Sequence, residues 1–219
     1  DERDVLWLAM ELLDGETLKS RISREGPLGV ERCLHIVRQV AESLQEAHEQ
    51  GMVHRDIKPG NIMLIDRGGD PDFVKVIDFG IAKIVRETLA PGRDMTQTGH
   101  ILGTPKYMAP EQIRDTEVDG RADMYALATV AYAILTREVP FAEGSPMEIA
   151  SRQMTERPPP IRDLAPDLDV GSAFESVLLR ALSKDPDRRF DDVLAFVDAL
   201  EEAALSAGAS TPSPAGAPP

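Results

Sequence analysis

The segment from Ala122 to Thr136 constrains the fold most, because it is apolar on nearly every side of a helix. A helix with that pattern cannot lie on a surface, so we expect it to be the buried central helix of the molecule. Its longest apolar run, Met124 to Leu135, is too short to span a bilayer. The 219-residue chain is long enough to surround such a helix with one core or two small ones.

Apolar positions recur at helical spacing on both sides of this segment. They predict further helices over Thr17–Glu25, Val30–Gln50, Met147–Met154, Ala173–Ser183 and Asp191–Leu205. Runs typical of strands predict a buried strand at Val5–Met10, followed by a turn to Gly15, and a small hairpin made by Ile62–Ile65 and Phe73–Ile77. This order of elements predicts a mainly α fold of the α+β kind, a helical bundle with a small β-hairpin.

Two segments have no such pattern. Residues 78–111 are expected to be a long loop, and loops of that length in compact domains are usually functional. Residues 206–219 are rich in Ala, Pro, Ser and Gly, which predicts a disordered linker. We therefore expect one domain over residues 1–205 and a linker over 206–219. The chain opens at Asp1 rather than Met, so we expect it to be a fragment of a longer protein.

Composition excludes several classes of protein. A hydrophobic fraction of 42% predicts a folded chain, and a net charge of −14 argues against a nucleic-acid partner, which would require a basic surface. The single cysteine, Cys33, excludes an intramolecular disulfide and indicates a reducing, cytoplasmic location. We interpret it as a packing residue. His35, His48 and His100 lack metal-ligand spacing, and we interpret them as incidental.

Three motifs carry chemical information. They are His54-Arg55-Asp56-Ile57-Lys58-Pro59-Gly60-Asn61, then Ile77-Asp78-Phe79-Gly80, then Gly103-Thr104-Pro105-Lys106-Tyr107-Met108-Ala109-Pro110-Glu111. Each alone is a weak signal, but accident is a poor explanation for their order and spacing. They resemble the signature motifs of protein kinases. The resemblance runs from Val5 to about Leu205, and it is closest to the bacterial Ser/Thr kinases of eukaryotic type.

Phosphoryl transfer needs a carboxylate near the incoming hydroxyl and oxygen ligands that hold Mg²⁺ against the phosphates. Asp56, Asn61 and Asp78 supply that set. The resemblance implies that Asp56 is the catalytic base, with Asn61 beside it, and that Asn61 and Asp78 bind the metal. It implies that Lys58 stabilises the transferred phosphate. The alternative is ordinary loop chemistry, in which Asp and Asn form turns and caps and Lys58 is a solvent-exposed lysine.

The resemblance also implies ATP as cofactor, with Mg²⁺ or alternatively Mn²⁺. Met10 would lie behind the adenine, and the backbone of Glu11 and Leu13 would contact it. Lys58, Asn61 and Asp78 would complete the ATP site. For Met10, a simple core methionine is an equally good interpretation.

Regulation is implied by Arg55, since kinases with an arginine before the catalytic aspartate usually require a phosphate in the activation loop. Thr96 and Thr98 are the expected phosphorylation sites, either of which would add charge that Arg55 could pair. The alternative is that both belong to an ordinary polar loop. Thr104 is expected to contact Asp56 and Lys58 and to help select Ser/Thr acceptors.

Other residues have structural roles by resemblance. Glu111 should form a buried ion pair with Arg189, although Arg188 competes for that role. Asp123 should brace the catalytic loop from the start of the central helix. His54 is expected to be a packed residue, and Phe79, before Gly80, a packing switch.

The sequence contains no Gly-x-Gly-x-x-Gly and no P-loop motif. We therefore expect the large lobe of a kinase without its small lobe, inactive when isolated. Expected partners are proteins with Ser/Thr acceptors and a second copy for autophosphorylation. No membrane segment is expected, although residues beyond Pro219 could anchor the whole protein. The alternative function is a pseudokinase-like scaffold or binding module, but the intact Asp56, Asn61 and Asp78 favour the enzyme.

Overall fold

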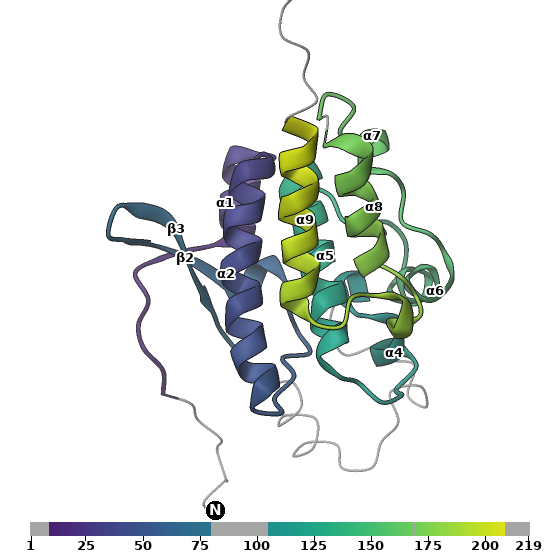
Figure 1. Ribbon diagram of the computed structural model, residues 1–219. Coiled ribbons are helices and arrows are strands. Elements are labelled where there is room, and N and C mark those ends of the chain that lie inside the picture. Colours follow the sequence, from purple (N-terminus) through teal and green to yellow (C-terminus); the bar gives the residue numbers. More distant parts are fainter. Residues whose placement is uncertain (1–8, 80–104, 169, 209–219) are drawn as a thin grey trace, which may run out of the picture.

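The computed structural model describes residues 9–79, 105–168 and 170–208. A small antiparallel sheet lies beside a bundle of helices (Figure 1). Its helices are α1 (Leu18–Glu25), α2 (Val30–Glu49), α4 (Pro110–Ile113), α5 (Gly120–Thr136), α6 (Pro146–Thr155), α7 (Ile161–Leu164), α8 (Gly171–Ala181) and α9 (Val193–Gly208). Its strands are β1 (Gly15–Thr17), β2 (Ile62–Arg67) and β3 (Asp70–Val76), and single 3₁₀ turns are η1 (Pro59–Asn61), η2 (Pro105–Tyr107) and η3 (Pro186–Arg188).

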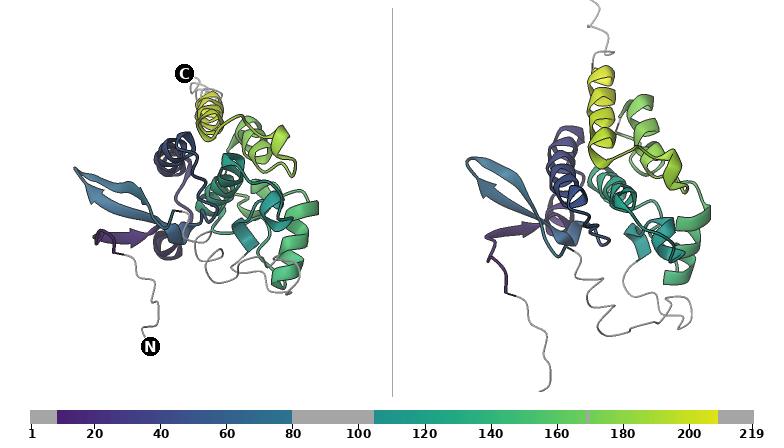
Figure 2. Two further views of the ribbon diagram at one scale, coloured as in Figure 1. Left: turned by 90° about the horizontal axis from the view of Figure 1, so that it is seen from below. Right: turned by 60° about the horizontal axis from the view of Figure 1, so that its bottom comes forward.

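Helix α5 is the centre of the core, which confirms the expectation from its apolar sequence. Every residue from Ala122 to Thr136 is buried, including the large side chains of Tyr125 and Tyr132. Helices α2, α8 and α9 pack around it, and α2 separates it from the sheet (Figures 1 and 2). Because the burial of apolar surface is the main favourable term in folding, α5 is the element on which the others depend.

The longer helices agree with the sequence prediction to within a few residues, because their signals are local. Helix α1 begins where the Thr17 hydroxyl accepts a hydrogen bond from Ser20 N, and it ends at Gly26, whose φ is 81°. The Ser145 hydroxyl and the Glu148 carboxylate cap α6 reciprocally. The prediction missed the two four-residue helices, α4 and α7.

The predicted hairpin is confirmed, with Ile62 opposite Val76 and Leu64 opposite Val74. Both strands are longer than predicted. The prediction also missed β1, which pairs antiparallel with β2 and gives the sheet three strands. Of the strand predicted over Val5–Met10, the structure describes Ala9 and Met10 alone. Neither belongs to a strand, so the prediction is wrong at these two positions.

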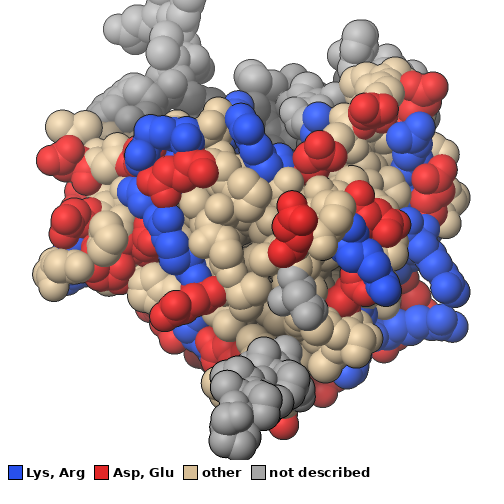
Figure 3. Space-filling view, turned by 90° about the horizontal axis from the view of Figure 1, so that it is seen from above, with Lys and Arg blue, Asp and Glu red and all other residues tan. Residues whose placement is uncertain are grey.

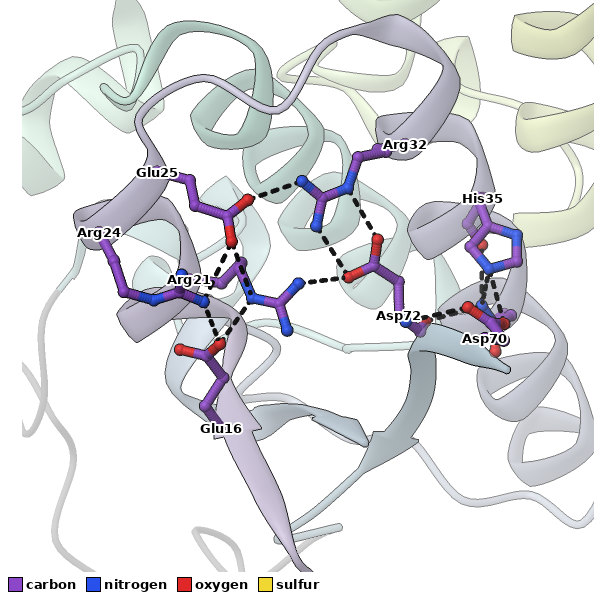
Figure 4. Close-up of polar contacts among 9 residues, drawn as sticks. Glu16, Arg21, Arg24, Glu25, Arg32, His35, Asp70 and Asp72 are labelled. Carbon is purple, nitrogen blue, oxygen red and sulfur yellow. Dashed lines mark hydrogen bonds and ion pairs between the residues drawn. The ribbon is translucent and has the colours of Figure 1, made fainter. Parts of the chain in front are cut away.

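A group of charged side chains joins the sheet to α1 and α2 (Figure 4). We call it the Asp72 cluster, and it consists of Glu16, Arg21, Arg24, Glu25, Arg32 and Asp72. Arg21 contacts Glu16 of β1 at 2.6 Å and Asp72 of β3 at 2.8 Å. On α2, the Gln39 amide donates to Asp72 O and accepts from Val74 N, so it bonds β3 as a further strand would. The hairpin is thereby fixed against the helices.

The surface and the end of the described chain have two further features. Seen from above, acidic and basic side chains are interspersed, so no single sign of charge dominates that face (Figure 3). Helix α9 continues to Gly208, so residues 206–208 of the expected linker are helical, and the following residues lie outside the described part. Over the described residues, we find no helix with the length and apolar character needed to span a membrane.

Candidate active site

The loop between α2 and β2 holds Asp56, Lys58 and Asn61 together. Lys58 Nζ donates to Asp56 Oδ2 at 2.6 Å, and Asn61 Nδ2 donates to Asp56 O at 2.9 Å and to Oδ2 at 3.0 Å. The side chains of Asp56 and Lys58 are each 40% exposed, whereas Asn61 is buried. Both side-chain bonds to the carboxylate use Oδ2, so with respect to the described residues Oδ1 is the oxygen of Asp56 that can meet an incoming hydroxyl.

Asp78 lies where the hairpin returns to this loop. Ile77 N donates to Asn61 O at 3.0 Å, which brings the residue after it, Asp78, to the same end of the sheet as Asn61. The amide nitrogen of Asn61 is used on Asp56, so among the described residues the amide oxygen of Asn61 and the carboxylate of Asp78 are the oxygen ligands that a metal ion could use. Mg²⁺ prefers oxygen ligands of this kind, and the donor set therefore fits that ion.

The buried carboxylate of Asp123 fixes the start of the loop. It accepts hydrogen bonds from His54 N, Arg55 N and His48 Nε2, each at 2.8 Å. A carboxylate suits this position because an ionised Asp only accepts. Gly120 leaves room for His48, since a Cβ there would lie 2.6 Å from His48 Nδ1. The interpretation of His48 as incidental is therefore wrong. The sequence indicated only that His48 belongs to the apolar pattern of the helix predicted over 30–50, and not which residue it contacts.

His54 joins the two halves of the site. Its Nδ1 accepts from Asp56 N at 3.3 Å, which assigns the proton to Nε2, and Nε2 donates to Ile77 O at 2.9 Å. Its fully buried ring packs against Phe79, with the ring centroids 4.6 Å apart. His54 thus contacts the loop that carries Asp56 and the strand end that leads to Asp78.

Arg55 and Asp78 adopt left-handed backbone conformations, with φ of 67° and 64°. Such values are uncommon for residues other than glycine and persist where neighbours hold them. At Arg55, the N–H is bound by Asp123, and the carbonyl accepts from Gln112 Nε2 at 2.8 Å. Gln112 Oε1 in turn accepts from Ala109 N. The sequence prediction assigned no role to Gln112. The only indication in the sequence was that Gln112 directly follows the motif residue Glu111.

Glu111 pairs with Arg189 through two hydrogen bonds, of 2.6 and 2.8 Å, and both side chains are buried. Arg189 also donates to Arg121 O and Ser183 O, so backbone carbonyls accept from two more of its N–H groups. Arg188, the competing candidate, is 81% exposed and lies 3.7 Å from Asp185. The geometry resolves the alternative in favour of Arg189.

A small open hollow lies beside Asp56. Its lining is Arg55, Asp56, Ile57, Lys58, Tyr107 and Met108. Burial raises the pKa of the Tyr107 hydroxyl to about 12. The hollow is the side from which an acceptor could reach the exposed part of Asp56.

The remaining candidate residues are less well placed by the structure. Met10 is 59% exposed, which contradicts its alternative interpretation as a core methionine. Leu13 is half-buried, and Glu11 lies 3.4 Å from Lys75 of β3. The other candidates, Gly80, Thr96, Thr98 and Thr104, lie outside the described residues, as does His100, which was interpreted as incidental.

Comparison with solved structures defines the fold class. The kinase domain of Mycobacterium tuberculosis PknI superposes with a TM-score of 0.65 at 30% identity, covering 89% of this chain and 64% of that one. Rad53 bound to AMP-PNP gives a TM-score of 0.67 at 24% identity, covering 87% of this chain and 46% of that one, and supports the fold alone. The fold is that of the protein kinases.

Sequence comparison identifies the family. The family model of the protein kinase domain matches residues 1–200. Serine/threonine-protein kinases pkn3 and Pkn1 of Myxococcus xanthus are each 44% identical, over 91% and 90% of this chain. PknB of Mycolicibacterium smegmatis is 40% identical over 84% of it. The chain belongs to the protein kinase domain family, and it spans 36%, 27% and 28% of the length of these three relatives.

Proposed function

We propose that the chain provides the acceptor- and metal-binding lobe of a Ser/Thr protein kinase, which transfers the γ-phosphate of ATP to Ser/Thr hydroxyls of proteins. The observation that carries this proposal is the half-exposed Asp56 carboxylate, which faces an open hollow and has Lys58 and Asn61 bonded to one oxygen. The two bonds hold the carboxylate by Oδ2 and leave Oδ1 to accept a hydrogen bond from a hydroxyl. That arrangement suits the orientation of a hydroxyl.

Each residue of the site then has a role. Asp56 orients the acceptor hydroxyl and takes its proton, and Lys58, already beside that carboxylate, stabilises charge on the transferred phosphate. Asn61 and Asp78 would hold Mg²⁺, or Mn²⁺ in its place. When bound, the ion neutralises negative charge on the phosphates. The protein's own contribution is mainly positioning, which phosphoryl transfer requires more than covalent catalysis.

The nucleotide would contact this lobe through the backbone near Met10, Glu11 and Leu13 as well as through Asn61 and Asp78. The 219 residues contain no glycine-rich phosphate loop. We therefore propose that they hold the nucleotide on one side and that the isolated chain transfers phosphate at no useful rate. The full-length gene product is the form expected to be active.

We further propose that phosphate on Thr96 or Thr98 activates the enzyme by pairing with Arg55, and that Thr104 helps to select Ser/Thr acceptors. A second copy of the protein would phosphorylate the first, and both would act in the cytoplasm on protein substrates. Phosphate adds nearly two negative charges at neutral pH and orders a segment where an arginine can pair with it. Mass mapping of the active full-length protein should find phosphate on Thr96 or Thr98; phosphate found only elsewhere contradicts this step.

The direct test is a transfer assay. The full-length protein, incubated with Mg²⁺ and ATP labelled at the γ-phosphate, should label myelin basic protein on serine or threonine. Residues 1–219 alone, assayed at equal concentration, serve as the control and should give no transfer above background. A full-length protein that binds ATP but transfers nothing would contradict the enzyme and favour a scaffold.

A further inference from the structure

A chain of polar side chains, half-buried at Lys184 and buried at Tyr125 and Gln153, crosses the molecule from the α8–α9 connection to η2. Lys184 Nζ donates to the Tyr125 hydroxyl at 3.0 Å, and that hydroxyl donates to Gln153 Oε1 at 2.5 Å. Gln153 Nε2 then donates to the carbonyl oxygens of Pro105 and Lys106, at 3.3 and 2.7 Å. Helices α5 and α6 and the segment at 105–107 are joined in this way.

Gln153 is the pivotal member of this chain. It is 1% exposed on an α6 face whose other buried residues are Ile149 and Ala150. A buried amide must satisfy both its donors and its acceptor, because each buried group left unpaired destabilises the fold by the cost of removing it from water. Gln153 uses its two N–H groups on η2 and its oxygen on Tyr125. Its side chain therefore has one satisfactory orientation.

Lys184 fixes the direction of the chain. Its ammonium lies 4.8 Å from the ring centroid of Phe141 and 5.4 Å from that of Tyr125. Burial, with the nearby charge of Arg189, lowers the pKa of Lys184 to about 8. Because an ammonium can only donate, the Tyr125 oxygen accepts from it, and the phenolic proton goes to Gln153. Every donor then points toward the carbonyls of Pro105 and Lys106.

We propose that Gln153 is a positioning residue that holds the wall of the acceptor site, an inference that rests on the proposed function. The two carbonyls that it binds come directly before Tyr107 and Met108, which line the hollow beside Asp56. Met108 N also donates to Pro105 O, at 3.2 Å. Holding those carbonyls from inside the bundle sets where the side chains of Tyr107 and Met108 stand relative to Asp56.

The proposal predicts a selective kinetic effect. Gln153 bonds the acceptor wall, whereas Asn61 and Asp78 are held through separate bonds to the catalytic loop and Ile77. Loss of the Gln153 amide should therefore weaken binding of the protein acceptor and leave the nucleotide side unchanged. A side chain that merely stabilises the fold would not separate these two effects.

The test uses the full-length protein with two substitutions. Gln153→Met keeps the length of the side chain and removes its hydrogen bonds, and Gln153→Glu keeps an acceptor for Tyr125 but loses both donors. Thr136→Val is the matched control, because Thr136 Oγ1 donates a buried hydrogen bond to Tyr132 O and accepts from Glu138 N at the opposite end of α5. All three variants should lose stability, but only the two at Gln153 alter the wall.

With myelin basic protein as acceptor, each Gln153 variant should raise the KM for that protein about tenfold. The KM for ATP, and the slow hydrolysis of ATP without acceptor, should stay within about twofold of wild type. Thr136→Val should change neither KM. Equal changes in both KM values, or an acceptor KM that stays at the wild-type value, would overturn the proposal.

Hydrogen exchange provides a readout that does not depend on activity. Amides of Tyr107 and Met108 should exchange faster in Gln153→Met than in Thr136→Val, and equal exchange overturns the positioning role. If the wild-type protein transfers no phosphate, the proposed function fails, while this comparison still decides whether Gln153 holds the wall. Should Gln153→Met fail to fold, Tyr125→Phe, which removes the bond to Gln153 Oε1, should give the same pattern more weakly.

Discussion

Polar side chains stabilise two regions of this molecule in different ways. In the Asp72 cluster, charged side chains pair with one another, and Arg21 and the partly exposed Arg32 both reach the buried Asp72 (Figure 4). Around the candidate active site, buried side chains bond to the backbone instead. Asp123 binds two N–H groups of the loop that carries Asp56, and Gln112 binds the carbonyl of Arg55.

The difference explains how the site is left available for chemistry. Pairs that involve exposed side chains, such as that of Arg24 with Glu16, contribute little because water and salt screen them. Buried groups bonded to the backbone fix its path more strictly, since breaking one leaves an unpaired polar group without water. Because Asp123 and Gln112 fix the loop, Asp56 and Lys58 remain half-exposed at the hollow.

The largest effect on stability is expected at the buried ion pair. Arg189→Met should lower the free energy of unfolding by about 3–5 kcal/mol, because Glu111 would remain buried without its partner. Denaturant unfolding monitored by circular dichroism measures this loss. The neighbouring Arg188→Met is the matched control and should be close to neutral, since Arg188 is exposed. The double variant Glu111→Gln/Arg189→Met should lose less than the sum of the two single variants; strict additivity would show that the pair is not coupled.

A smaller loss of stability is expected when Asp123, which holds the loop that carries Asp56, is substituted. Asp123→Asn should cost about 2–3 kcal/mol, since an amide cannot accept from all three donors that the carboxylate binds. It should also reduce activity of the full-length protein through the path of residues 54–56. Denaturant unfolding together with a transfer assay measures both. Unchanged stability would show that Asp123 does not carry the loop.

These contacts also mark the limit of what the sequence could predict. The helices were predictable because an apolar face at helical spacing is a local signal, as in α2 and α5. Strand β1 was missed because three residues carry no period and their pairing with β2 is nonlocal. The grouping of Asp56, Asn61 and Asp78 was predictable because each belongs to a short motif that can be read directly from the sequence.

The supporting residues could not be predicted in the same way. His48 contacts Asp123 across 75 positions of sequence, and Gln112 contacts Arg55 across 57. Gln153 reaches Lys106 across 47 positions. Nothing near any of these side chains specifies the partner, because the packing of α2, α4 and α6 around α5 creates the contact.

The Asp72 cluster should give a smaller effect that depends on salt. Asp72→Asn should cost about 1–2 kcal/mol at low ionic strength, because hydrogen bonds to a charged group are lost, and somewhat less at about 1 M salt, where the pair with the partly exposed Arg32 is screened. Asp66→Asn is the matched control on the same hairpin, because Asp66 is exposed. Urea unfolding at both salt concentrations tests this. A loss that does not change with salt would place the role of Asp72 in packing rather than charge.

The same cluster predicts the smallest effect, on the pH dependence of stability. Burial opposes ionisation of Asp72, but hydrogen bonds from Arg32 and the charges of Arg32 and Arg21 outweigh it and lower its pKa below the usual 3.8. A carboxyl with a lowered pKa stabilises the fold above its unfolded pKa and loses that contribution as pH falls through the folded value. The stability difference between wild type and Asp72→Asn should therefore be constant near neutral pH and shrink below about pH 4. A difference that grows on acidification would contradict the assigned direction.

The most direct test of the account is Asp56→Asn in the full-length protein, measured for both stability and phosphate transfer. Its carboxylate is half-exposed and the loop is fixed by other residues, so the free energy of unfolding should change by less than about 1 kcal/mol. The rate of transfer to myelin basic protein should fall by about 10²–10⁴-fold. A variant that is equally stable and still transfers phosphate at the wild-type rate would contradict the assignment of Asp56 as the catalytic base.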